Sequence, residues 1–197
     1  MSESKTPQLV EIHQRCEVFF KEQLDGAFAR QHISISQESA FYLLVIMSLG
    51  LKTYPGLQTQ SLAERYLAAQ REERPDVLRD VGDLSLIIAG IWWQSLARRL
   101  VDVDYYIILG RLSYKMVSEM GLPVQSDLFE ELSQNFLDLV NVLMEASQCV
   151  TDAVTSNRDI LRMYEVWQRT RNDLLAAKLR SLGINVIPVG ETARFIH

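Results

Sequence analysis

The stretch 76–120 constrains the fold most, because it joins two helical patterns that are apolar on nearly every side. Its first part repeats apolar residues at steps of three and four, which line one face of an α-helix: Val77, Val81, Leu84, Ile88 and Ile91. Beyond Leu84 the other faces are apolar as well. A helix without a polar face is normally covered on all sides, so we expect it at the centre of the molecule. The second pattern, 103–120, should pack beside it and complete a buried central helix pair.

The rest of the chain continues in helical patterns separated by turn signals. Further helices are expected over 8–30, 37–49, 62–73, 127–154 and 157–182, with one possible short strand at 184–189. Four local signals mark helix ends, namely Ser34 with Gln37, Ser61 with Glu64, Pro75, and Gly183. We therefore predict an all-α fold, a compact single-domain helical bundle of about six to eight helices over 1–197. Residues 1–7 are expected to form a flexible N-terminus and 184–197 a C-terminal tail.

Composition narrows the class of protein. With 197 residues, 48% of them hydrophobic, the chain can bury one sizeable core. A formal charge of -5 gives no positive field for phosphates, so nucleic acid is not expected as a partner. No apolar run approaches the ~18 residues that span a bilayer, and the first residues do not form a signal peptide, so no membrane is expected either. Two cysteines in apolar helical patterns, Cys16 and Cys149, are typical of a reducing cytosol, and we expect a cytoplasmic, bacterial-type protein.

Common catalytic and metal-binding motifs are absent from the sequence. Zinc sites use ligand pairs three or four residues apart, and His13 with Cys16 is the one pair of a histidine with another histidine or a cysteine at that spacing, with no second pair to complete a ligand set. His13 precedes Glu17 by four residues, a pair more typical of an exposed helix surface. We therefore predict no metal site and no bound cofactor.

The acid Asp83 is the strongest single candidate for chemistry, because it lies in the most apolar helix of the chain. A buried carboxylate is costly unless it is paired. Arg98 and Arg99 follow about one helix later and could return to form a structural ion pair with Asp83, which is the interpretation that we favour. In the alternative, an all-α enzyme, the catalytic candidates that meet across a pocket are Asp80, Asp83, Arg98, Arg99 and Tyr106.

The string Gly82-Asp83-Leu84-Ser85 resembles the start of the distal-helix motif of haem oxygenases, which are also all-α proteins. The resemblance implies haem or tetrapyrrole binding, with His13 or His32 as the proximal ligand. The glycines that follow in that family, which let the backbone approach the haem, are Leu86 and Ile87 in this chain. Haem binding is kept as an alternative function.

Adjacent aromatic residues indicate a possible contact surface. In the pairs Trp92-Trp93 and Tyr105-Tyr106, neighbouring side chains on a helix point about 100° apart, so both cannot face one core. The helices either have core on two sides, or Trp93 or Tyr105 lines a pocket or a subunit contact. Several helices are apolar on more than one side, which favours a homodimer formed through apolar surface near the central pair.

Charge is distributed unevenly over the last two predicted helices. Residues 121–157 contain six acidic and no basic side chains, and residues 158–180 contain six basic and three acidic ones. Opposite signs favour an antiparallel hairpin of these helices, or alternatively a surface that orients a protein partner. Taken with the absence of catalytic motifs, the sequence favours a protein-interaction or regulatory, small-ligand-binding module.

Overall fold

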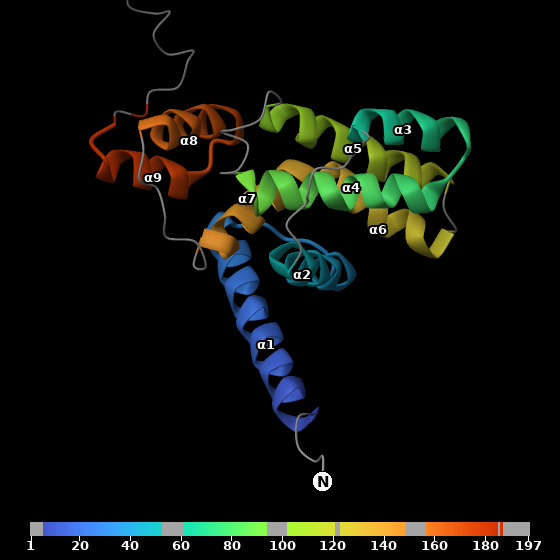
Figure 1. The fold of residues 1–197 in the computed structure, drawn as a ribbon, viewed down its shortest axis with the longest axis horizontal. Coiled ribbons are helices and arrows are strands. Elements are labelled where there is room, and N and C mark those ends of the chain that lie inside the picture. Colours follow the sequence, from blue (N-terminus) through green and yellow to red (C-terminus); the bar gives the residue numbers. More distant parts are fainter. Residues whose placement is uncertain are drawn as a thin grey trace, which may run out of the picture.

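The computed structural model describes residues 6–52, 61–93, 102–120, 123–148, 157–184 and 186 (Figure 1). These residues form nine α-helices and no strand, which confirms the all-α prediction. The helices are α1 (Thr6–Gln31), α2 (Gln37–Lys52), α3 (Leu62–Arg71), α4 (Pro75–Gly90), α5 (Val103–Met120), α6 (Pro123–Gln134), α7 (Phe136–Gln148), α8 (Asn157–Thr170) and α9 (Asp173–Ser181). Of the expected strand at 184–189, Ile184 and Val186 are not in a strand, and the other positions lie outside the described residues.

Two interruptions explain why this count is slightly higher than the expected six to eight. At Asn135 the side-chain Nδ2 donates to the carbonyl of Glu131 at 2.9 Å, and α6 ends there before α7 begins. After α8, Arg171 adopts a left-handed backbone with φ of 55°. The Asn172 side chain then accepts from the amides of Leu174 and Leu175, both at 3.1 Å, and starts α9 as an N-cap.

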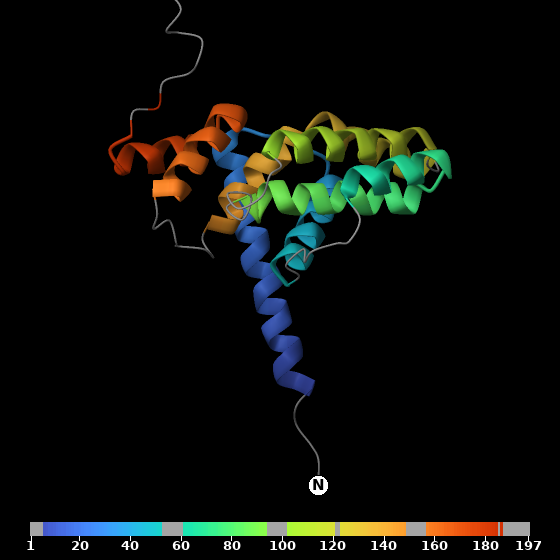
Figure 2. The same cartoon turned by 45° about the horizontal axis from the view of Figure 1, so that its top comes forward.

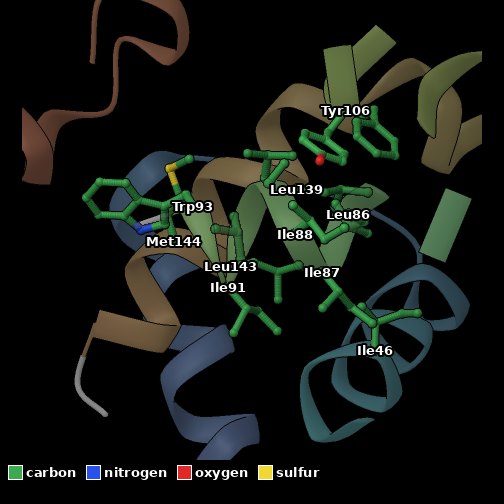
Figure 3. Packing of buried hydrophobic residues seen from close by; sticks show 14 of the residues in the cluster. Ile46, Leu86, Ile87, Ile88, Ile91, Trp93, Tyr106, Leu139, Leu143 and Met144 are labelled. Carbon is green, nitrogen blue, oxygen red and sulfur yellow. The ribbon is translucent and has the colours of Figure 1, made fainter. Parts of the chain in front are cut away.

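The predicted central pair is α4 and α5, which lie side by side along their length. Every residue of α4 from Ser85 to Gly90 is buried, so the second half of this helix is covered on all sides, as the sequence beyond Leu84 predicts. Figure 3 shows its isoleucines among side chains from several other helices. On α5, by contrast, Ile108 and Leu112 are 59% and 46% exposed. One side of the second helix therefore faces outward.

Small residues allow the helices of the core to approach closely. A Cβ atom at Gly110 of α5 would lie 2.2 Å from Cζ of Phe136 on α7 and 2.9 Å from Cβ of Ser85 on α4. Only glycine fits at this crossing, because neither the buried ring nor the neighbouring helix can give way without losing packing.

Local sequence signals locate several helix ends correctly. Ser61 and Glu64 form both hydrogen bonds of a capping box at the start of α3, and Pro75 is the first residue of α4. Gly183 follows α9 with φ of 80°. The predicted cap at Ser34 is wrong, because Ser34 is exposed and Ser36 takes the role: its Oγ accepts from the Ser39 amide at 3.1 Å.

The outer helices are arranged unevenly around the core. Figures 1 and 2 show α8 and α9 together at one end, and α1 leaving the body so that its first half extends away from the other helices. The predicted charge-matched hairpin shows no ion pair among the described residues; instead, Arg169 of α8 pairs with Asp102 and Asp104 at the start of α5. No helix in the described part of the chain has the length and apolar composition needed to cross a membrane.

Candidate functional site

The candidate site is centred on Asp83, where three helices meet. Its Oδ1 atom accepts hydrogen bonds from the Tyr42 hydroxyl of α2 at 2.7 Å and the Tyr114 hydroxyl of α5 at 2.8 Å. Asp83 itself lies on α4 and is half-buried. The carboxyl therefore joins the central pair to α2 through two phenols.

Gly82 and an aromatic cluster position these phenols. A Cβ at Gly82 would lie only 2.4 Å from Cε1 of Tyr114, so glycine makes room for the ring against α4. Tyr114 is completely buried, and its ring centroid lies 5.5 Å from that of Phe129 and 5.6 Å from that of Phe136. Tyr42 packs edge-on against Phe129 at 5.6 Å. The aromatic rings thus hold both hydroxyl groups against the carboxyl.

Burial dominates the electrostatics of the cluster. It raises the pKa of Asp83 from 3.8 to about 6, although the hydrogen bonds from Tyr42 and Tyr114 and the nearby Arg79 oppose the change. The pKa values of Tyr42 and Tyr114 are also raised, first by burial and then by the Asp83 charge. The two phenols consequently keep their protons and act as donors. A half-buried carboxyl that titrates near pH 6 could in turn accept or release a proton close to neutral pH.

Two further polar contacts hold α2 against the core. Near its start, the Glu131 carboxylate of α6 accepts from the Ser36 amide at 2.9 Å and from the hydroxyls of Ser36 and Ser39. Burial would raise the pKa of Glu131, but these serine hydrogen bonds lower it below its usual value. Near the other end, the Trp92 indole donates to the Gly50 carbonyl at 2.8 Å. The helix α2 is therefore attached at its start, middle and end.

The other predicted catalytic candidates do not join Asp83 in the described structure. Asp80 is exposed, 3.9 Å from Arg79. Tyr106 is 5% exposed and packs edge-on against Tyr105, with ring centroids 5.0 Å apart. Arg98 and Arg99 lie outside the described residues, so the predicted ion pair stays a prediction.

The histidines proposed as haem ligands are both associated with α1. His32 is exposed directly after the helix, with φ of 55°, and His13 is in α1, where its side chain is outside the described part. Leu86 and Ile87, which stand where haem oxygenases have glycines, are 0% and 7% exposed and fill the core beside α4 (Figure 3). Among the described residues no group of three metal-binding side chains occurs.

A second candidate is the exposed apolar surface of α2. Phe41, Val45 and Leu49 are 68%, 40% and 52% exposed and follow one another at steps of four, so they form one stripe along the helix, the α2 stripe. The adjoining helix α1 exposes Val18 at 59% and Phe19 at 40%. Side chains of this kind are normally covered, which makes the surface a candidate binding face.

Trp93 was expected as a possible anchor of a subunit contact, and this expectation is wrong. The residue is 3% exposed, because the end of α4 is enclosed by core on more than one side (Figure 3). Tyr105 is half-buried, and its hydroxyl accepts from the Ala63 amide at 2.9 Å, which ties it to α3.

Tyr42, Glu131 and the α2 stripe are not among the functional residues that the sequence predicts. Asp83 is recognisable as an isolated acid in an apolar helix, but nothing local identifies which helix lies opposite it. The stripe carries a usable signal, because the pattern 37–49 is apolar nearly all round and only some of its faces can be enclosed in a chain of this size.

Comparison with known protein families, with curated proteins and with solved structures found no match for this chain.

Proposed function

We propose that this protein is a cytoplasmic protein-interaction module. Its binding face is the α2 stripe together with Val18 and Phe19 of the adjoining helix α1. The observation that carries the proposal is Phe41, a large apolar side chain that is 68% exposed. Val45 and Leu49 extend the same surface over two further turns. Aromatic side chains at the centre of an apolar patch commonly anchor protein interfaces.

The attachment of α2 supports this role. Binding residues are most effective when they are held on a rigid element, because ordering a mobile one on binding costs free energy. The hydrogen bonds of Glu131, Asp83 and Trp92 fix α2 along its length, while its outer stripe stays accessible. The helix is thus prepared for contact before a partner arrives.

A second copy of the chain is the partner that we propose first. Twofold dimers are the commonest closed assemblies, and a face with exposed apolar side chains can be covered by an equivalent face. The sequence favoured an interface near the central pair, where Ile108 and Leu112 of α5 are exposed. We prefer α2, because its stripe is longer and contains the most exposed large apolar side chain of the described residues, Phe41.

Site-specific photo-crosslinking in cells tests the binding face without knowledge of the partner. A photoreactive phenylalanine analogue is placed at position 41, at position 108, or at position 67, where Leu67 is 49% exposed on α3 and serves as the matched control. We expect discrete adducts from position 41, including one of twice the chain mass, and few from position 67. Adducts from position 108 alone would move the interface to α5, and the absence of adducts at 41 would contradict the proposal.

Ligand binding or acid–base chemistry at Asp83 is the second candidate function. It is favoured by the half-buried carboxyl with a pKa of about 6 and two fixed phenol donors. A thermal-shift screen of small molecules on the wild-type protein and on Asp83→Asn tests it. Compounds that raise the melting temperature of the wild-type protein but not that of Asp83→Asn support a binding site at Asp83. A screen that finds no such compound contradicts a binding site there.

A further inference from the structure

The first half of α1 extends away from the other helices, and the α2 stripe is exposed on the same chain. The helix α1 is continuous from Thr6 to Gln31, and its second half packs on α2 and α7, where Leu24 and Ala27 are buried. Its first half extends beyond the body in both views (Figures 1 and 2). An isolated helical segment of this length is only marginally stable in water, so a partner that covers it would stabilise it.

A single copy of the chain cannot cover the α2 stripe with its own α1. Because α1 is one uninterrupted helix, its first half cannot fold back onto the α2 stripe of the same molecule. The apolar spacing that places Leu24 against the body continues toward the N-terminus in the sequence, at Leu9, Ile12, Cys16 and Phe19. The same repeat that packs on the body therefore runs past its edge.

Resting on the proposed function, we infer that the partner of the α2 stripe is the first half of α1 from a second copy of this chain. Both contacts form at once around a twofold axis, so each copy gives one α1 and receives the other. This arrangement closes the assembly and leaves neither apolar surface exposed. It is a contact between two helices, made with the chain's own α1.

Length agrees with this docking. The α2 stripe spans Phe41 to Leu49, about 12 Å at 1.5 Å per residue, which the first half of α1 exceeds. Segments 6–20 and 38–49 together have the size that a standard interface uses on each side, about 20 to 30 residues. The docking places the two exposed phenylalanines, Phe19 of one copy and the partner's Phe41, opposite each other.

Disulfide trapping between two copies tests the inference. In full-length protein with Cys16→Ser and Cys149→Ser, one tagged batch carries Phe19→Cys and a second, differently tagged batch carries Phe41→Cys. Mixing under mild oxidation should give at least fivefold more mixed disulfide dimer than the matched mixture of Phe19→Cys with Leu67→Cys. All three side chains that are replaced by cysteine, Phe19, Phe41 and Leu67, are exposed in a single chain, so folding should be retained.

The possible results separate this inference from the proposed function. A mixed yield equal to that of the Leu67→Cys control would overturn the docking of α1 on α2. Efficient linking of Phe19→Cys to itself would show that two α1 helices pair with each other, which contradicts the inference but keeps an interface at this face. A monomeric mass for the wild-type protein, together with crosslinks from position 41 to other proteins, would show that the partner is not a second copy of the chain. That result would overturn this inference and still support the proposed interaction module.

Discussion

At the scale of single residues, the ionisation of Asp83 should make stability depend on pH in a predictable direction. The pKa of Asp83 is about 6 in the folded protein and 3.8 for the free side chain, so the folded state holds this proton more tightly. Its contribution to stability is therefore fully present below about pH 3.8 and is lost as pH rises through 6. Full burial would make the loss about 3 kcal/mol, and solvent screening of this half-buried group reduces it to roughly 1 to 2 kcal/mol.

The substitution Asp83→Asn keeps an acceptor for the phenols and removes the titration. Urea unfolding from pH 4 to pH 7 should show the wild-type protein losing about 1 to 2 kcal/mol relative to Asp83→Asn. Asp80→Asn, one turn earlier at an exposed position, is the matched control for the loss of a negative charge. A difference between wild type and Asp83→Asn that stays constant with pH would mean that Asp83 is not buried among the tyrosines.

A second prediction concerns the space that Gly82 leaves for Tyr114. In Gly82→Ala the new methyl group would lie 2.4 Å from a ring that is completely buried, so we expect a loss of about 1 to 3 kcal/mol in unfolding free energy. The matched helical control is Gly26→Ala, where the methyl group meets the flexible end of Arg30 at 3.1 Å. That change should be neutral or stabilising by up to about 1 kcal/mol. Equal effects of the two substitutions in urea unfolding would contradict the described packing.

The residue-scale predictions from sequence succeeded in part, for a physical reason. An acid in an apolar helix must find donors, so Asp83 could be selected without a structure. The identity of the donors depends on which helices pack against α4, and the hydroxyls of Tyr42 and Tyr114 come from patterns that look like ordinary core. Tyr106, the tyrosine named as a candidate, is buried and packs against Tyr105.

At the scale of elements, Glu131 should control how firmly α2 is attached. Glu131→Ala removes the acceptor for the Ser36 amide and for two serine hydroxyls, which we expect to cost about 1 to 3 kcal/mol. The matched control is Glu130→Ala, whose ion pair with Lys115 is screened by solvent and should contribute less to stability than the Glu131 contacts do. Hydrogen exchange by mass spectrometry should report faster exchange in the first turns of α2 for Glu131→Ala alone. Unchanged exchange there would mean that Asp83 and Trp92 suffice to hold the helix.

The packing of α4 also bears on the alternative function, haem binding. Its Leu86 and Ile87 fill the core where haem oxygenases have glycines, and His32 is exposed at the end of α1. Titration with haem is therefore expected to give no saturable Soret shift that depends on His13 or His32. Stoichiometric binding that disappears in His13→Ala or His32→Ala would show that the resemblance of residues 82–85 extends to function.

Helix ends were predictable from sequence where the stabilising contacts are local. The capping box of Ser61 and Glu64, the proline that begins α4, and Gly183 after α9 all act within a few residues. The start of α2 at Gln37 was predicted correctly, but its cap was assigned to Ser34 instead of Ser36, because Ser36 is held by Glu131, which lies far away in the sequence. The break between α8 and α9 was missed because Asn172 looks like an ordinary polar position in a helical pattern until its side chain is seen capping α9.

At the scale of the whole molecule, apolar composition predicted the buried centre but not the side that stays open. Hydrophobic periodicity shows which faces are apolar, whereas the covering of each face depends on the placement of all other helices. The second half of α4 is enclosed, while α2, with an equally apolar sequence, keeps a stripe outside. The sequence therefore predicted self-association through Trp93 or Tyr105 near the central pair, although the most exposed aromatic side chain of the described residues is Phe41.

Sedimentation equilibrium of the wild-type protein and of Phe41→Glu over a hundredfold concentration range tests self-association through the α2 stripe most directly. A charge at position 41 should leave the fold intact, because the side chain is 68% exposed, but it would be costly in an apolar interface. We expect the wild-type mass to rise toward twice that of the chain, Leu67→Glu to follow it, and Phe41→Glu to remain monomeric. A strictly monomeric wild-type protein, or a Phe41→Glu dimer as stable as the wild type, would contradict the account.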